Sequence, residues 1–427
     1  MFTLTSRISS QILVVSSGKL VISGFLFLSN ILLTRYLGAQ AFGIYSSCIA
    51  LIVLISGVVG DTLDLGVLRF VPPSLEKDRP KALLVLKVVF KIKLFTGILF
   101  LVLFSPIASD IGSVALQATR SGHLIRLVFL GIIGTMLFKS ANVYLQSHQN
   151  FGKYLFLDFV HTSGKLVLIT TLIFLNLLTV TYSVVVYAIM PLLTFFLSLW
   201  IVPRDYLFVK GSQKQTVLEV LFFSKWLIIS SLVGAIHSKL DILMLSILRG
   251  SEDTGIYAAA LNLALIPDVL SSFFTIVFYP KIMPMCHRGE FTQFFHRYLK
   301  NMVPLCIIGV ILSIAIAKPL ILSIYTTGYF ESVAIFKILI PGTIFWILVF
   351  PLALAFIFFN KPHLTVPIDL ATLAIVLLGN LFFIPKYGAL GASIITLFSR
   401  ILVGSFILIW VLRKSSYIER ELQISHK

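Results

Sequence analysis

Charged residues are scarce in this chain of 427 residues: only 12% are Asp, Glu, Lys or Arg, whereas 58% are hydrophobic. Soluble globular domains carry about 25% charged residues, so the composition excludes an ordinary soluble protein. The mean hydropathy of +1.02 indicates that most of the chain lies in a lipid bilayer. The apolar run that begins near Gln11 has no small-residue cleavage site, and we expect it to be a spanning helix and not a signal peptide.

Cysteine and the common catalytic motifs are also lacking. Cys48, Cys286 and Cys306 are too few and too scattered for a disulfide framework or a thiolate metal site. The eight histidines show no H-E-x-x-H spacing, and no G-x-x-x-x-G-K-[ST] loop is present to bind ATP. We therefore expect no metal, no cofactor and no enzymatic activity in this chain.

Long apolar segments dominate what remains, and a spanning helix needs about 20 such residues. Cutting the chain at charge clusters and turns predicts twelve spans: 12–34, 42–68, 85–108, 123–144, 155–175, 182–202, 222–246, 257–280, 298–316, 335–358, 364–384 and 389–412. The predicted fold is an all-α integral membrane protein of about 12 transmembrane helices. These form two six-helix bundles, residues 1–210 and 211–427. No connecting loop is long enough to form a domain or a catalytic pocket.

The basic residues follow a topological pattern. Although the formal net charge is +17, one predicted face has only Arg35, Arg120, Arg249, Lys318 and Lys386 in its loops, and most other loop lysines and arginines lie on the opposite face. Basic residues gather on the cytoplasmic side of membrane proteins. This asymmetry predicts that both termini are cytoplasmic, and it explains the net charge without a nucleic-acid partner.

A short motif, G-x-x-x-x-G-I-Y, occurs once in each predicted bundle, directly after its first span. Its fixed residues are Gly38, Gly43, Ile44 and Tyr45 in the first half and Gly250, Gly255, Ile256 and Tyr257 in the second. Glycines permit tight turns and tyrosines are enriched at membrane interfaces, so ordinary turn chemistry is the alternative explanation. A second match, Arg69 and Pro72 against Lys281 and Pro284, favours duplication. Parallel six-span repeats would be related by a pseudo-two-fold axis along the membrane normal, as in transporters.

The motif and its surroundings resemble a known family. "LTRYLGAQAFGIYSS" (33–47) and "DLGVLRF" (64–70) are similar to the opening of the polysaccharide-transporter branch of the multidrug/oligosaccharidyl-lipid/polysaccharide (MOP) exporter superfamily, the Wzx-type O-antigen flippases. "KLDILMLSIL", "GIYAAA" and "YTTGYFESVAIFKIL" resemble segments of its second half. The matching residues are Arg35, Gly38, Phe42, Gly43, Tyr45, Asp64, Gly66, Arg69, Asp241, Gly255, Tyr257 and Ala260.

The resemblance implies a MOP/MATE-like fold and a flippase. Such a protein moves an oligosaccharide on polyprenyl pyrophosphate from the cytoplasmic to the outer leaflet of a bacterial inner membrane by alternating access. Membrane lipids, the lipid-linked glycan, and a glycan polymerase and glycosyltransferases of the same pathway are the expected partners. The glycan could belong to O-antigen, capsule or exopolysaccharide. A MATE-like cation-coupled drug or metabolite antiporter and a membrane glycan polymerase or ligase are the alternatives, although the latter generally carries a long outer loop.

Several cations lie inside the predicted spans, where a charge is costly unless it is paired or faces water. A cavity lined by such cations would suit an anionic pyrophosphate. Lys165 shares a helix face with Asp158 and His161, so a structural Asp–Lys pair and a polar stripe lining a cavity are both open interpretations. The candidates for substrate binding are Lys19, Lys139, Lys165, Lys225, Lys239 and Arg400.

Acidic residues inside the spans are candidates for a coupling ion. Asp64, Asp158, Asp268 and Asp369 could carry a proton or a sodium ion, although they form no clustered oxygen cage in the sequence. An antiporter for cationic substrates should show a more acidic cavity than a flippase. The nature of the intramembrane charges therefore distinguishes the two transport hypotheses.

Overall fold

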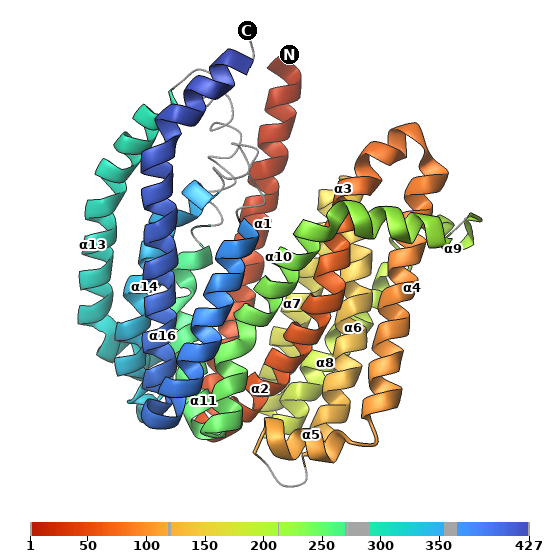
Figure 1. Cartoon of the computed structure of the whole chain (residues 1–427). Helices are drawn as coiled ribbons and strands as arrows, with labels where there is room; N and C mark the ends of the chain where they lie inside the picture. Colours follow the sequence, from red (N-terminus) through yellow and green to blue (C-terminus); the bar gives the residue numbers. More distant parts are fainter. Residues whose placement is uncertain are drawn as a thin grey trace. The chain divides into compact units, whose positions relative to one another are not determined.

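The computed structural model describes residues 2–117, 121–211, 213–269, 271, 290–353 and 365–425, with side chains not described at 2–14, 213–228, 291, 353, 365 and 414–425 (Figure 1). Helices make up nearly all of these residues, and none of the described residues lies in a strand. The all-α prediction is therefore confirmed.

The chain divides into two compact units, Met1–Gly255 and Ile256–Lys427. The first unit contains α1 (Phe2–Leu37), α2 (Ala39–Ser56), η1 (Gly57–Asp61), α3 (Thr62–Lys77), α4 (Arg79–Phe104), α5 (Ala108–Ala115), α6 (Gly122–Ser147), α7 (Phe151–Phe174), α8 (Val180–Ser198), α9 (Asp205–Phe208) and α10 (Gln213–Leu248). The next helix, α11 (Ser251–Ala264), crosses the division. The second unit contains α13 (Phe291–Ile324), η2 (Thr327–Tyr329), α14 (Ser332–Ala353) and α16 (Thr365–Ser425).

The unit boundary falls later in the chain than the predicted division between 210 and 211. The reason is α10, which packs against α2, α3 and α4 and so belongs to the first unit by its contacts. The arrangement as two six-helix bundles, and the pseudo-two-fold axis between them, stay predictions.

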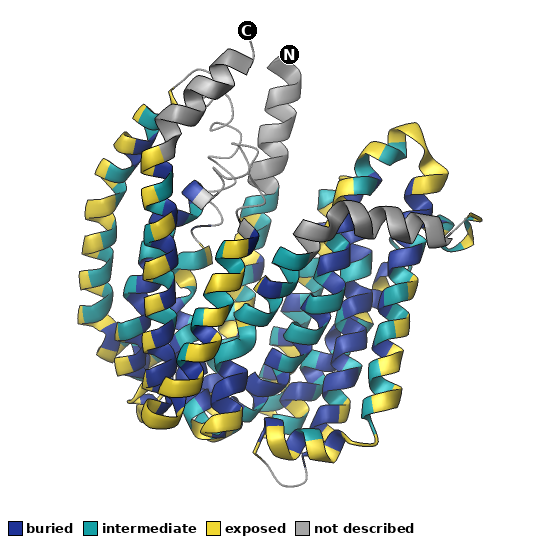
Figure 2. Ribbon diagram, viewed as in Figure 1, coloured by how far each residue is buried: buried dark blue, intermediate teal, exposed yellow. Residues whose placement is uncertain are grey.

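The first unit is built around α6, which packs against α2, α4, α5, α7 and α8. Figure 2 shows α6 as largely buried, whereas exposed positions follow the outer face of α4. Gly131 on α6 allows this packing, because a Cβ there would lie 2.6 Å from Ile52 Cδ1 of α2. Most side chains of α6 therefore lie in the interior of the unit.

The second predicted span is one long helical stretch with an irregular turn inside it. α2, η1 and α3 run without a break over Ala39–Lys77, and η1 is a turn of π-helix, a wider form that occurs frequently at functional sites. η1 ends at Asp61 and the next turn carries Asp64. Two acidic side chains thus lie near the middle of a helix that is otherwise mostly apolar.

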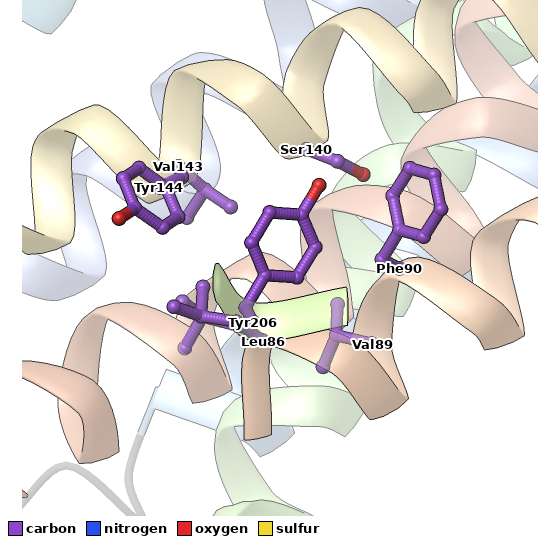
Figure 3. Close-up of a pocket in the computed structure, with 8 residues that line it drawn as sticks. Leu86, Val89, Phe90, Ser140, Val143, Tyr144 and Tyr206 are labelled. Atoms are coloured by element: carbon purple, nitrogen blue, oxygen red, sulfur yellow. The ribbon is translucent and has the colours of Figure 1, made fainter. Parts of the chain in front are cut away.

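The segment after α8 is anchored to the first unit by a tyrosine. Tyr206 of α9 is buried and points into a small pocket, as Figure 3 shows, between α4, which carries Phe90, and α6, which carries Ser140 and Tyr144. Burial, together with nearby Asp205, raises the pKa of the Tyr206 phenol to about 12. Tyr206 therefore fixes the segment that leads into α10.

The second unit shows why two predicted spans appear as one long helix. α16 includes Gly388, whose backbone (φ 56°, ψ −135°) is not helical, so two helices meet there at a kink. A positive φ of this kind favours glycine. The kink lies between the predicted spans 364–384 and 389–412. The predicted outer loop around 317–334 is also shorter than expected, because α13 continues to Ile324.

Within the described residues, nine helices are long and apolar enough to cross a membrane, or up to ten if the pair α4 and α5, bent by 90°, is counted as one span. Residues 270 and 272–280 of the predicted span 257–280 lie outside the described residues, so the number twelve stays a prediction. Large apolar side chains are exposed on the outer helices, including Phe95 on α4 and Ile311 on α13, at 67% and 60%. Such surfaces are expected where helices face lipid.

Candidate functional site

An ion pair joins the first and fifth predicted spans. The Lys19 ammonium on α1 pairs with the carboxylate of Asp158 on α7, and it lies 4.6 Å from the ring centre of Tyr154. Asn142 of α6 donates from Nδ2 to Asp158 Oδ1 at 3.2 Å. Three helices therefore meet at one carboxylate.

Lys165 has a different environment from the one that its spacing suggests. Its side chain is buried, and its ammonium lies 3.9 Å from the ring centre of Tyr187 on α8. The expected pair with Asp158 does not form, because Asp158 is engaged by Lys19 instead. The neighbouring His161 ring stacks on Phe138 of α6, with ring centres 4.4 Å apart. Within the described part of the chain, no carboxylate forms a salt bridge with Lys165, although Asp158 is near enough to interact with it electrostatically.

Four charges from four elements form a second cluster. Lys139 Nζ of α6 donates to Asp61 Oδ1 of η1 at 2.5 Å, and Lys93 Nζ of α4 donates to Asp64 Oδ1 of α3 at 2.6 Å. Asp61 and Lys139 are also near enough to Asp64 to interact with it electrostatically. We call these four residues the acid–lysine cluster. Its charges balance, with two carboxylates and two ammonium groups.

Sequence reasoning missed two members of this cluster. Lys93 is not among the predicted substrate-binding cations, but it is 0% exposed and lies well inside α4. Asp61 was not singled out, although it lies one turn before Asp64. Lys93 could have been found because it is a lysine inside an apolar segment. Asp61 could have been found because it lies three residues before Asp64, on the same helix face.

One turn of α6 connects the two sites. Lys139 belongs to the acid–lysine cluster, and Asn142, three residues later, contacts Asp158 of the Lys19–Asp158 pair. Residues three apart lie on the same face of a helix. The two sites are thus neighbours along one face of the central helix.

The other predicted cations are in different situations. Lys239 on α10 is half-buried, and no described carboxylate pairs with it. The side chain of Lys225 lies outside the described residues. Arg400 forms two hydrogen bonds to Asp268, 3.0 Å from Nη1 to Oδ1 and 2.8 Å from Nη2 to Oδ2. A predicted substrate cation and a predicted coupling acid are therefore partners within the second unit. Asp369 is half-buried in the first turns of α16.

The glycines of the repeated motif contact one another through the backbone. Gly38 and Gly250 have φ of 78° and 94°, values that favour glycine. A Cβ added at Gly43 would lie 1.7 Å from the carbonyl oxygen of Ser251, and one added at Gly255 would lie 1.9 Å from that of Ala39. Each motif therefore packs against the other at the same relative positions.

The motif tyrosines are buried in the protein, and their position at the membrane interface stays a prediction. Tyr45 packs against Phe42 and Tyr187, and Tyr257 is 0% exposed. The Tyr257 hydroxyl hydrogen-bonds Thr396 Oγ1 at 3.2 Å.

The remaining motif residues lie on helices of the first unit. Arg35 is exposed in the last turn of α1, Gly66 is buried in α3, Arg69 is exposed, and Asp241 is half-buried in α10. Lys281 and Pro284 of the second sequence match lie outside the described residues. No group of three His, Cys, Asp or Glu that could hold a metal occurs among the residues that the structure describes.

Comparison with known proteins gives a family and a fold. A family model described as a polysaccharide biosynthesis protein matches residues 8–285. A solved structure of the lipid II flippase MurJ, in an inward closed conformation, has a TM-score of 0.74 at 14% identity, covering 96% of this chain and 91% of that chain. No curated protein matches the sequence.

Two further structures belong to the MATE transporters. An inward-facing multidrug resistance transporter of the MOP superfamily has a TM-score of 0.73 at 12% identity, covering 93% of this chain and 95% of that chain. A MATE transporter of Vibrio cholerae has a TM-score of 0.62 at 12% identity, covering 97% of this chain and 100% of that chain. The resemblance to a polysaccharide family that the sequence motifs indicated is confirmed by the family model. This multi-pass membrane protein has the MOP fold and belongs to the polysaccharide biosynthesis protein family.

Proposed function

We propose that this protein is a flippase that moves an oligosaccharide linked to polyprenyl pyrophosphate from the cytoplasmic to the outer leaflet of a bacterial inner membrane. It would do so by alternating access and would supply surface polysaccharide synthesis. The family supports a role in polysaccharide biosynthesis, and the fold is that of transporters. Both termini would be cytoplasmic, and the glycan polymerase and glycosyltransferases of the pathway would be its partners.

The observation that carries the proposal is the buried ammonium group of Lys165. A buried charge without an opposite partner costs several kcal/mol in a membrane. Lys165 has an aromatic ring against its ammonium and forms no salt bridge among the described residues, with Asp158 acting on it only through space. A lipid-linked diphosphate brings about two negative charges into a region of low dielectric, where nearby cations stabilise it strongly. Lys165 is thus available to a substrate anion, whereas Lys19, Lys139 and Arg400 are engaged by acids.

The acids suggest how movement could be driven. Asp64, Asp158 and Asp268 each hold a basic partner, so uptake of a proton would release Lys93, Lys19 or Arg400. We propose that a proton or a sodium ion couples to transport through such acids, with Asp369 as a further candidate.

Transport by sealed inverted vesicles tests the function. Vesicles that carry lipid-linked glycan should move it between leaflets in a protein-dependent manner. Lys165→Ala should slow this movement by about tenfold or more, which corresponds to about 1.4 kcal/mol of lost stabilisation, and Lys165→Arg should retain part of it.

Lys153→Ala is the matched control, since Lys153 lies on the same helix but is exposed at its first turn. It should move glycan at the wild-type rate. Efflux of a cationic dye without movement of any glycan would instead support the antiporter. Equal rates for Lys165→Ala and wild type would remove Lys165 from the substrate path.

A further inference from the structure

The ion pairs of the first unit differ in how open they are to their surroundings. In the Lys93–Asp64 pair the side chains are 0% and 14% exposed, whereas in the Lys139–Asp61 pair they are 31% and 46% exposed. The Lys19–Asp158 carboxylate is 15% exposed and has a second partner, Asn142. Asp61 is therefore the most accessible acid of the three pairs.

The open pair nevertheless faces the interior of the unit and not the lipid. Asp61 Oδ2 lies 3.6 Å from the position of a Cβ on Gly57, and that position lies 3.2 Å from Ala235 of α10. The other partner, Lys139, belongs to α6, the central helix. Asp61 and Lys139 thus lie among η1, α6 and α10, on the inner side of the α2–η1–α3 helix.

Polar groups near this pair are not fully satisfied. Asn142, one turn along α6, is 7% exposed, and its Oδ1 has no hydrogen-bond partner in the described part of the chain. Buried polar atoms of this kind are rare and require an explanation. An amide that keeps one group free beside two ion pairs is able to accept a hydrogen bond from an incoming ligand.

We propose that the Asp61 carboxylate competes with the anionic headgroup for Lys139. Without substrate the carboxylate pairs with Lys139, and a diphosphate displaces it. The inference rests on the proposed function, since it supplies the reason for a diphosphate to reach Lys139. Exchange of one anion for another keeps the lysine paired throughout, which avoids an uncompensated charge.

The same arrangement sets a threshold for binding. A tethered group competes at an effective concentration that is typically in the millimolar range. It lowers the apparent affinity of Lys139 for every other anion by the same factor. Phospholipids carry singly charged phosphodiesters in abundance, and a weak monoanion would not displace Asp61. A diphosphate with about two charges binds more strongly and remains able to do so. Asp61 would therefore exclude ordinary lipid headgroups from the path.

Binding measurements on the purified full-length protein in detergent test this role, with inorganic pyrophosphate and dimethyl phosphate as probes. Asp61→Asn keeps the shape of the side chain and removes its charge. It should tighten pyrophosphate binding by about tenfold or more, the range expected when a charged competitor is lost. Dimethyl phosphate should bind measurably to the variant and not to wild type.

Asp205→Asn is the control for net charge, because Asp205 of α9 forms an exposed pair with Arg79 of α4, outside the acid–lysine cluster. It should leave both affinities unchanged. Lys139→Gln should weaken pyrophosphate binding, and Asp61→Asn should not restore it in the double variant. If Asp61→Asn does not fold, Asp61→Ser provides the same comparison.

Pyrophosphate affinity that is unchanged or weaker in a folded Asp61 variant would overturn the proposal, as would failure of that variant to bind pyrophosphate at all. These outcomes are separate from the flippase assay. If the protein moves glycan and the Asp61 variant binds pyrophosphate as wild type does, only the proposed competition by Asp61 is rejected. Tighter anion binding without any glycan movement would reject the proposed substrate and leave the exchange intact.

Discussion

Lys93 is fully buried, and its ammonium donates to a single described carboxylate, that of Asp64, at 2.6 Å. A buried ion pair adds little to stability compared with apolar residues of the same size, but loss of one partner leaves the other charge uncompensated. We therefore expect the stability of the protein to fall when either Lys93 or Asp64 is replaced alone, and to fall much less when both are replaced together.

We predict that Asp64→Asn lowers the free energy of unfolding by about 3–5 kcal/mol, because Lys93 then lacks its opposite charge. The double variant Asp64→Leu with Lys93→Met should lose much less, since both charges are removed together. Thermal unfolding in detergent, followed by size-exclusion chromatography, measures the difference. Equal melting temperatures for Asp64→Asn and wild type would contradict the prediction.

The sequence identified the charged positions more readily than their partners. Lys19, Lys139, Lys165 and Arg400 could be selected because each is a cation inside an apolar segment. Their partners lie far away in the chain, as for Lys19 with Asp158 and Arg400 with Asp268. Helical spacing reports neighbours on one helix only, so it favoured Asp158 as the neighbour of Lys165.

At the scale of the elements, the helices that follow the two G-x-x-x-x-G-I-Y glycine turns approach closely enough to exclude any side chain. The start of α2 contacts the start of α11 through backbone atoms at Gly43 and Gly255. This contact explains why both motifs need glycine at the same place, for which the sequence offered only a turn. It also supports duplication, although it does not show a symmetry axis.

We predict that Gly43→Ala and Gly255→Ala each destabilise the protein by about 1–3 kcal/mol, the usual cost of overpacking. The added methyl group would clash with a carbonyl oxygen that side-chain rotation cannot move. Thermal unfolding should show a lower transition temperature for both variants. Gly24→Ala is the control, because a Cβ at that position on α1 has nothing within 4 Å; an equal loss there would show that the glycine contact is not the cause.

Helix positions followed well from the apolar pattern, and helix irregularities did not. The break at Gly388 lies between two predicted spans because a loop glycine was visible there. The π-turn at Gly57–Asp61 was not visible, since hydrophobicity averaged over a span does not register one extra residue in a turn. α13 is longer than the predicted span 298–316, because Lys318 and Pro319 lie inside the helix and do not end it.

At the scale of the whole molecule, the distribution of lysine and arginine predicts the orientation in the membrane. Leu177 lies exposed in the short connection between α7 and α8, and Lys210 lies exposed in the segment between α9 and α10. These two positions are expected on opposite sides, with Lys210 in the cytoplasm.

Labelling of introduced cysteines measures that orientation. In a chain without Cys48, Cys286 and Cys306, a membrane-impermeant maleimide should label Leu177→Cys in spheroplasts and label Lys210→Cys only after permeabilisation. Cys48 is buried, so alanine, which is smaller and adds no polar group, is the replacement to use there. Labelling of Lys210→Cys from outside would reverse the predicted topology.

The π-turn at η1 has a consequence for motion. An α-helix advances by about 100° per residue, and a wide turn holds one residue more than its neighbours. If the wide turn moves past Asp61 by one residue, the carboxylate rotates by about 100° around the helix while α2 and α3 stay intact. A shift of the π-turn by one residue can thus bring Asp61 to Lys139 or withdraw it. The α2–η1–α3 helix need not bend, and no loop need change.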